Sequence, residues 1–531
     1  MVYTVSVTVP PDRESDEAYI RNEVFTALKQ KDVDTSDAVL VKTKRSIDAR
    51  HHSVKLILRY DVYIGERPAS VQDSLPEWKH ADGSKKVIIV GSGPAGLFGA
   101  FTLLEAGVQP IIIERGEQAG QRKRDIALIS TKGVVGADSN YCFGEGGAGT
   151  FSDGKLYTRS DKRGNLPLVL KIFAHFGASE RILTDAHPHI GTEKLPAIIT
   201  AMRNKIIELG GECHWNMRVT DLITQNANGS TSVCGVKTEN TKTGEIKEFT
   251  GDAVLLATGH SATDIYEIIT RHSPESLEAK TFAVGVRVEH PRTTIDDIQF
   301  HGKKTQNLGA AEYRLTSQQD GRGVYSFCMC PGGFVVPSST APEQIVINGM
   351  SASGRNSKWS NAAIVVETRP EDIPEQYRVL DCPALAGLRW RTALEHLTWQ
   401  KGDGQKAPAQ RLKDFLNHKD STSLPASSYA PGLVASRLDT WLPPQIAKRL
   451  AAGFKDFNKH MKGFICDDAL IIASETRTST PVRILRNAES GECKGLAGLY
   501  PAGEGSGYSG GIASSAMDGV KQCKAILNAL H

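Results

Sequence analysis

Two hydrophobic patterns divide the chain near residue 80. In the first 65 residues, apolar and polar positions alternate over 3–9 and again over 54–62, and an apolar stripe with helical spacing covers 20–28. Alternation with period two indicates half-buried strands, whereas the stripe indicates an amphipathic helix. Together with a short strand expected over 38–42, these elements follow the order β-α-β-β. That order predicts a small ferredoxin-like α+β unit.

From residue 86 the apolar positions no longer alternate. Residues 87–90 and 111–113 are wholly apolar, and helical stretches separate them. Such runs are typical of parallel strands that are covered on both faces. The predicted fold class is therefore α/β, with a Rossmann-type three-layer domain. We expect four segments: a small ferredoxin-like domain and linker at 1–80, the first part of the Rossmann-type domain at 81–275, an inserted mixed α+β substrate domain at 276–464, and the C-terminal part of the Rossmann-type domain at 465–531.

Composition narrows the class of protein only a little. The chain of 531 residues is 40% hydrophobic and 23% charged, which is ordinary for a globular protein. Its net charge of +3 gives no argument for nucleic acid or an anionic membrane as partner. Nine cysteines without a CxxC pair favour reduced thiols over a disulfide framework. Neither a secretory signal nor an apolar run of membrane-spanning length is recognisable, so we expect a cytoplasmic protein, with an organelle as the alternative.

A glycine-rich turn follows the first wholly apolar strand. Residues 91–96 read GSGPAG, a helical segment follows, and the strand over 111–113 ends at Glu114. Gly91 allows the tight turn, Gly93 lets the backbone approach a diphosphate, and Gly96 lets helix and strand pack closely. The helix N-terminus points N–H groups at the phosphates, and the Glu114 carboxylate can accept hydrogen bonds from the ribose hydroxyls. This combination predicts a dinucleotide site.

Two later segments favour FAD over NAD as the dinucleotide. Residues 253–259 (AVLLATG) form an apolar strand that ends in Ala-Thr-Gly, and residues 499–512 place Glu504 and a glycine pair before another helix. We expect Glu504 at the ribityl chain or the diphosphate, and the helix N-terminus at the flavin edge. The glycines of 144–149 lack the strand and helix of a second nucleotide site, so we expect them against the flavin ring. The predicted cofactor-binding residues are Gly91, Ser92, Gly93, Pro94, Ala95, Gly96, Glu114, Arg115, Gly146, Gly147, Val219, Thr258, Gly259, Gly503, Glu504, Gly510, Gly511 and Ile512.

Three side chains are candidates for catalysis. His260 follows the strand that ends in Ala-Thr-Gly, at the edge where α/β sheets bind ligands, so it can transfer protons or merely cap the next helix. Cys328 and Cys330 form a Cys-x-Cys pair. They are either redox-active or flavin-adjacent thiols, or two small core residues on one face of a strand. No cluster with zinc spacing supports a metal ion.

Two groups of basic residues allow both a binding and a structural interpretation. Arg477 and Arg483 could clamp a carboxylate or a phosphate, but we favour internal pairs with Glu475 and Glu504. The N-terminal unit is also locally basic, and there we favour a solvated sheet edge over a binding surface. Its basic residues are Lys42, Lys44, Arg45, Arg50, Lys55 and Arg59.

Several motifs resemble those of a family of uncharacterised FAD-dependent dehydrogenases. They cover nearly the whole chain in order: FGEGGAGTFSDGKL at 143–156, HIGT at 189–192, GHSA at 259–262, RGVYSFCMCPGG at 322–333, NGMS at 348–351, ETRTS at 475–479 and GEG at 503–505. The resemblance implies a single FAD, one Rossmann-type domain with an inserted substrate domain, and an N-terminal ferredoxin-like extension. Glu504, where wider flavoproteins have aspartate, belongs to this family's pattern. The resemblance does not name a substrate.

These observations predict an oxidoreductase that binds FAD non-covalently and acts on a small molecule that the sequence does not identify. An electron donor or acceptor such as NADH or NADPH would complete the reaction, and neither a membrane nor a nucleic acid is an expected partner. Two alternatives remain open. One is an RNA-directed role through the basic N-terminal unit, and the other is a non-enzymatic flavin-binding sensor.

Overall fold

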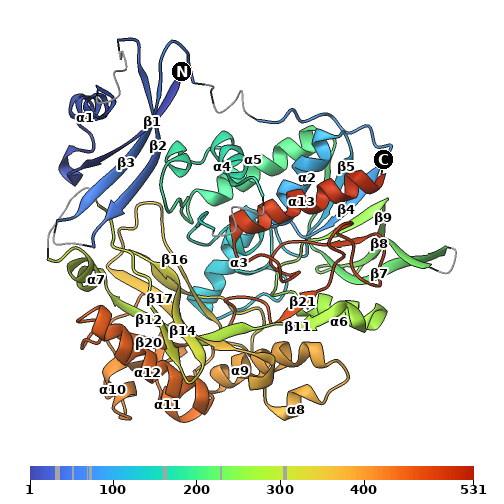
Figure 1. The fold of residues 1–531 in the computed structure, drawn as a ribbon. Coiled ribbons are helices and arrows are strands. Elements are labelled where there is room, and N and C mark those ends of the chain that lie inside the picture. The colour runs from blue at the N-terminus through green and yellow to red at the C-terminus, as the bar shows by residue number, and fades with distance from the viewer. Residues whose placement is uncertain are drawn as a thin grey trace.

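Three parts make up the molecule in the computed structural model (Figure 1). The structure describes residues 1–29, 36–50, 53–68, 70, 75–158, 164–227, 230–302 and 308–530. Residues 69 and 71–74 of the expected linker lie outside these ranges. Within them, none of the helices has both the length and the apolar character that a membrane span requires.

The N-terminal unit is a three-stranded antiparallel sheet with one helix. Its elements are β1 (Val2–Val9), α1 (Glu17–Lys29), β2 (Val39–Asp48) and β3 (Lys55–Tyr63), with spatial order β1-β3-β2. Val5, Val7 and Val9 are buried and alternate with exposed residues, as the period-two pattern requires. The predicted β-α-β-β unit is therefore confirmed.

The central part is built on a parallel sheet. Its strands, in spatial order, are β22 (Leu499–Pro501), β10 (Ala253–Leu256), β4 (Lys86–Val90), β5 (Gln109–Ile113) and β6 (Glu212–His214). Helix α2 (Pro94–Glu105) connects β4 to β5, and Pro94 stands at its first position, where no N–H is needed.

The two faces of this sheet are covered by different layers. Ile89 and Ile112 pack in one core with α2, α4 (Leu166–His175), α5 (Leu195–Glu208) and α13 (Ile512–Leu530). Their neighbours Ile88 and Ile111 point to the other face, toward α6 (Thr263–His272) and the antiparallel strands β7 (Met217–Ala227), β8 (Ser230–Asn240) and β9 (Ile246–Thr250). Burial on both faces explains why these strands are wholly apolar, and it confirms the three-layer Rossmann-type domain.

The third part is a seven-stranded mixed sheet. In spatial order its strands are β13 (Thr316–Gln319), β14 (Arg322–Cys330), β17 (Trp359–Thr368), β12 (Phe282–Pro291), β20 (Leu470–Glu475), β18 (Ala407–Arg411) and β19 (Leu433–Ala435). Helix α12 (Pro444–His460) packs Leu450, Phe454 and Phe457 into the core of this sheet. Because β20 pairs with β12, the inserted sheet continues past residue 464, and we place the end of the insert after Glu475.

Further helices and strands connect these layers. They are α3 (Ala119–Lys132), β11 (Leu277–Ala279), α7 (Arg292–Gln299), β15 (Phe334–Pro337), β16 (Ile347–Met350), α8 (Glu375–Arg378), α9 (Ala386–Gln400), α10 (Leu412–Leu416), α11 (Leu438–Trp441) and β21 (Val482–Ile484). The β15–β16 hairpin extends from the insert toward the Rossmann-type domain, and α9 stands beside β20.

The N-terminal unit is docked on both other parts. Arg45 in β2 donates its backbone N–H to Thr184 and accepts one from Ala186, at 2.8 Å each. Its buried residues also belong to the same apolar cluster as those of the insert. The Arg45 guanidinium binds Glu14 at 2.5 and 2.8 Å, and Arg50 binds Asp48 at 2.6 and 2.9 Å. Lys42 also lies 3.9 Å from Glu14, so three of the six basic side chains named from the sequence have acidic partners among the described residues.

Candidate functional site

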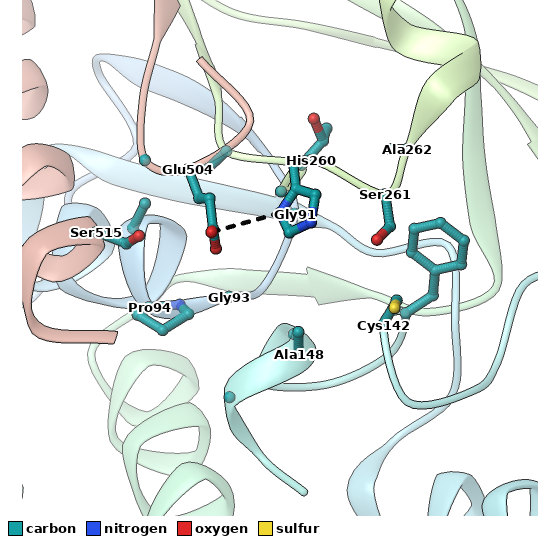
Figure 2. Close-up of a pocket in the computed structure, with 18 of the residues that line it drawn as sticks. Gly91, Gly93, Pro94, Cys142, Ala148, His260, Ser261, Ala262, Glu504 and Ser515 are labelled. Atoms are coloured by element: carbon teal, nitrogen blue, oxygen red, sulfur yellow. Dashed lines mark ion pairs between the residues drawn. The ribbon is translucent and has the colours of Figure 1, made fainter. Parts of the chain in front are cut away.

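One cavity lies at the carboxyl ends of β4 and β10 and reaches the β15–β16 hairpin of the insert (Figure 2). Most of the predicted cofactor-binding residues line it. They are Gly91, Gly93, Pro94, Ala95, Glu114, Arg115, Gly147, Val219, Thr258, Gly259, Gly503, Glu504, Gly511 and Ile512. Ser92, Gly96, Gly146 and Gly510 are not part of the lining, and of the three catalytic candidates only His260 is.

The turn after β4 presents bare backbone to the cavity. Gly91 has φ +104°, and a Cβ there would lie 2.5 Å from the Ala257 carbonyl oxygen. A Cβ at Gly96 would lie 2.0 Å from the Gly91 carbonyl oxygen, which accounts for a glycine where helix meets strand. A Cβ at Gly93 would have Gly147 Cα as its nearest neighbour, 3.9 Å away. The N-terminal turn of α2 is thus open to a ligand's phosphates.

Glu114 is occupied by hydrogen bonds from the protein. Its Oε2 accepts from the N–H and the hydroxyl of Ser92, at 3.0 and 2.7 Å. Its Oε1 accepts from the N–H groups of Gly116 and Gly144, at 3.0 Å each. Because a carboxylate offers about four acceptor positions, Glu114 fastens the phosphate turn to the loop that begins at Gly144. A ribose would have to share these oxygens.

Arg122 in α3 shapes the glycine loop at 144–149, a role that the sequence did not suggest. Its guanidinium is fully buried and donates to four backbone carbonyls, those of Asn140, Tyr141, Gly144 and Glu145, at 2.7–3.1 Å. Burial lowers the pKa of Arg122 to about 10. The loop then carries Gly147 and Gly149 to the starts of α2 and α13.

His260 and Glu504 form a pair on the cavity wall. His260 Nδ1 lies 3.5 Å from Glu504 Oε1, and the dashed line in Figure 2 marks this ion pair. The Nε2 atom of His260 is buried and has no hydrogen-bond partner among the described residues. The His260 carbonyl accepts a hydrogen bond from Arg391 at 3.4 Å, which fixes this turn to α9. Both side chains line the cavity, so they can form hydrogen bonds with a bound ligand.

A second polar corner of the cavity contains Arg477, Ser261 and Cys142. From the sequence we expected Arg477 to pair internally with Glu475 or Glu504. In the structure it pairs with neither. It binds Glu395 of α9 through two hydrogen bonds of 2.9 and 2.7 Å. Its Nη1 donates to the Ser261 hydroxyl at 3.4 Å and lies 3.9 Å from the Cys142 sulfur. Cys142 is therefore the cysteine that lines this cavity.

The other predicted ion pairs are also different in the structure. Glu475 binds Arg287 at 2.9 Å, and both side chains are buried. Arg483 binds Glu278 at 3.1 Å near the surface. Arg287 also donates to the Asn348 Oδ1 atom at 3.3 Å, and Asn348 lines the cavity. The Arg287–Glu475 pair therefore lies directly behind the cavity wall formed by β16.

Cys328 and Cys330 lie on β14, away from the cavity lining. The pairing of β14 with β17 shifts between Phe327 and Cys330, and Cys328 has φ +42°. This bulge leaves Cys328 exposed and Cys330 buried, so the two thiols do not share one face as regular strand positions would. Lys155 Nζ lies 3.5 Å from the Cys330 sulfur and 2.7 Å from Asp153.

Comparisons with known proteins place this site in a family. One family model, described as an FAD-dependent protein C-terminal domain, matches residues 281–478, and a second, an FAD binding domain, matches residues 84–129. A domain of unknown function matches residues 1–63. An uncharacterized protein of Clostridium beijerinckii is 36% identical over 521 residues, which cover 94% of this chain and 93% of that protein. The chain belongs to this family of FAD-dependent proteins.

The solved structures that match the chain are more distant. A 3-ketosteroid-delta4-(5alpha)-dehydrogenase from Rhodococcus jostii is 16% identical with a TM-score of 0.31, over 87% of this chain and 98% of that chain. A geranylgeranyl bacteriochlorophyll reductase-like protein from Thermoplasma acidophilum is 10% identical with a TM-score of 0.35, over 84% of this chain and 78% of that chain.

FAD is the cofactor of this family member, and the residues of the cavity fit it. The open backbone at Gly93 suits the diphosphate, and a Cβ at Gly510 or Gly511 would have no atom within 4 Å, which leaves the start of α13 free for the ligand. The Glu504 carboxylate also lines the cavity, and it can accept hydrogen bonds from the hydroxyl groups of the ribityl chain. FAD supplies redox chemistry, so this protein is an FAD-dependent oxidoreductase.

Proposed function

We propose that the protein is an enzyme that binds FAD non-covalently and oxidises or reduces a small molecule between the Rossmann-type domain and the insert. The observation that carries this proposal is the continuous cavity that joins the phosphate turn at Gly91–Pro94 to Asn348 and Gly349 of the insert. Cofactor sites in α/β folds lie at the carboxyl ends of the strands, and the insert supplies the opposite wall. When bound, FAD supplies the transfer of electrons or a hydride.

The His260–Glu504 pair is the proposed proton-handling group. The Glu504 carboxylate beside Nδ1 can accept a hydrogen bond from an N–H at that nitrogen. The pair can hold this proton at the cavity wall and release it when the charge nearby changes. Replacing His260 by Gln should keep FAD bound and change the pH profile of cofactor reduction. An unchanged profile would show that His260 only caps the turn before α6.

Cys328 and Cys330 remain candidates for a thiol role, but an indirect one. The buried Cys330 contacts Lys155, and the loop that carries Lys155 also carries Ser152 of the cavity wall. A thiol role would therefore act through the 152–155 loop. Cys328→Ser and Cys330→Ser should leave FAD content intact and alter reoxidation or turnover. Wild-type behaviour in both variants would remove the thiol role and leave the cysteines as packing residues.

The decisive experiment is anaerobic reduction of the purified yellow protein. NADH, NADPH and a panel of metabolites are added in turn, and the flavin absorbance is followed. Rapid bleaching by one compound, followed by turnover with an acceptor, is the expected result, and it also excludes a flavin-binding sensor. Folded protein that takes up no added FAD would overturn the proposal. Of the basic side chains behind the RNA-directed alternative, Arg45 is only 12% exposed beside Glu14, whereas Arg50 is 80% exposed beside Asp48.

A further inference from the structure

Two buried arginines share one buried carboxylate behind the cavity wall. Arg391 and Glu395 of α9 are 0% and 1% exposed, and the Arg477 side chain is 6% exposed. Arg477 occupies both oxygens of Glu395, and Arg391 Nε lies 3.7 Å from the same carboxylate. Glu504, the next carboxylate on the wall, faces His260 instead. This group of three side chains, the Arg391–Glu395–Arg477 cluster, therefore has an excess of one positive charge.

The excess positive charge of the cluster is accompanied by hydrogen-bond donors of Arg391 that have no acceptor in the part of the chain that the structure describes. Arg391 Nε and Nη1 are buried and have no hydrogen-bond partner among the described residues. Burial lowers the pKa of Arg391, whereas the Arg477 guanidinium holds the pKa of Glu395 below its ordinary value in spite of burial. An unmatched charge in a protein interior is strongly unfavourable unless a ligand of opposite charge compensates it. Arg391 does not line the cavity, so an anion would meet the positive charge of the cluster through Arg477, which does.

The cavity supplies the donors for such a ligand. Arg477 Nη1 has only a long contact with Ser261 and a sulfur contact with Cys142, so it retains donor capacity. Ser261 accepts a hydrogen bond from Arg477, so its own hydroxyl hydrogen is available for donation to a ligand. Ser338 contributes a second hydroxyl, 3.6 Å from the Cys142 sulfur. A guanidinium next to a hydroxyl is a typical binding arrangement for carboxylate and phosphate oxygens.

We propose that Arg477 and Ser261 form an anion subsite, and that the substrate of this enzyme is a small molecule with a carboxylate or phosphate group. The inference rests on the proposed function and adds the chemical class of the substrate. The diphosphate of FAD has its own place at the start of α2, whereas Arg477 comes from the segment after β20 of the insert. The substrate is therefore the ligand that meets the cluster.

The test uses the FAD-loaded protein and three simple probes: inorganic phosphate, acetate and benzoate. Each probe is titrated while flavin absorption and the melting temperature are recorded. At least one anion should perturb the flavin spectrum with saturation. Arg477→Gln should weaken that binding about tenfold, since a charge-assisted hydrogen bond is lost. The matched control is Arg483→Gln, which changes an arginine of the same segment that binds Glu278 near the surface and should bind anions as wild type does.

Two variants keep the test decisive. Arg477→Gln leaves Arg391 and Glu395 as a balanced pair, so it should fold. If it does not fold, Ser261→Ala provides the measurement and should weaken anion binding about threefold. A reducible FAD protein whose spectrum ignores all three anions would overturn the inference while leaving the proposed function intact. Loss of FAD from Arg477→Gln would also overturn it, because the anion would then be the diphosphate of the cofactor.

Discussion

Arg122 is a single side chain on which a loop of glycines depends. Its guanidinium binds four carbonyls between Asn140 and Glu145, and glycines alone cannot hold a loop in one conformation. Arg122→Met should release the loop, lower the free energy of unfolding by about 4 kcal/mol and abolish FAD retention. The measurements are the melting temperature and the flavin-to-protein absorbance ratio. Arg124→Met on the exposed face of the same helix is the control, and equal behaviour of the two variants would contradict this role.

Replacing Glu114 tests what its carboxylate contributes to stability and to FAD binding. In Glu114→Gln an amide N–H₂ replaces one oxygen and faces N–H donors, either those of Gly116 and Gly144 or those of Ser92. We expect a loss of about 2 kcal/mol in stability and weaker FAD binding, because the phosphate turn and the glycine loop separate. Titration of the apoprotein with FAD checks this. Unchanged affinity and stability would show that neither the loop contact nor a ribose contact matters.

The residues of the site were predictable to the extent that their roles are local. Glu114 and the glycines of the phosphate turn lie on one strand–turn–helix–strand unit, so their spacing along the chain predicts their position. The corner of Arg477, Ser261 and Cys142 was not predictable, because 335 residues separate Arg477 from Cys142. For the same reason the ion-pair partners predicted for Arg477 and Glu475 were wrong. Charge type alone does not choose among buried partners.

At the scale of elements, β14 and β20 show where a pattern of residues falls short. Cys-x-Cys predicts two thiols on one strand face, but the bulge after Phe327 turns Cys328 outward. The apolar sequence of β20 fits a buried strand in either sheet, and its pairing with β12 and β18 is decided by tertiary contacts. The boundary expected at residue 464 followed from that ambiguity. The pattern of residues predicts that a strand forms, but it does not predict which strands it pairs with.

His290 on β12 predicts how the inserted sheet responds to acid. It is fully buried, Nε2 lies 2.8 Å from the Phe464 carbonyl, and burial lowers its pKa to about 4. The unfolded chain then binds the proton more strongly, so the contribution is intact above pH 6.5 and is lost as the pH falls toward 4. Between pH 7 and pH 5 the loss should be about 2 kcal/mol. Melting temperatures measured across this range should fall less steeply for His290→Gln, and parallel curves would contradict the assignment.

At the scale of the whole molecule, Arg355 ties the insert to the Rossmann-type domain. It binds Glu312 of the insert and lies 3.6 Å from Asp153, whose side chain is 4% exposed. Although burial raises it, the pKa of Glu312 is lowered to about 2, because His187 and Arg355 favour the ionised form. Asp153 adjoins Ser152 of the cavity wall, so this contact transmits the position of the insert to the cofactor site.

Arg355→Gln should therefore loosen the two parts and weaken FAD binding at once. Removing one partner of a buried ion pair leaves Asp153 with Lys155 alone and should cost about 3 kcal/mol. The melting temperature, the FAD dissociation constant and the rate of limited proteolysis report the three effects. Arg369→Gln is the matched control, since Arg369 binds Glu367 within one strand end at the surface and its loss should cost less than about 1 kcal/mol. A destabilised Arg355→Gln protein with unchanged FAD affinity would show that the contact holds the insert without positioning the cavity.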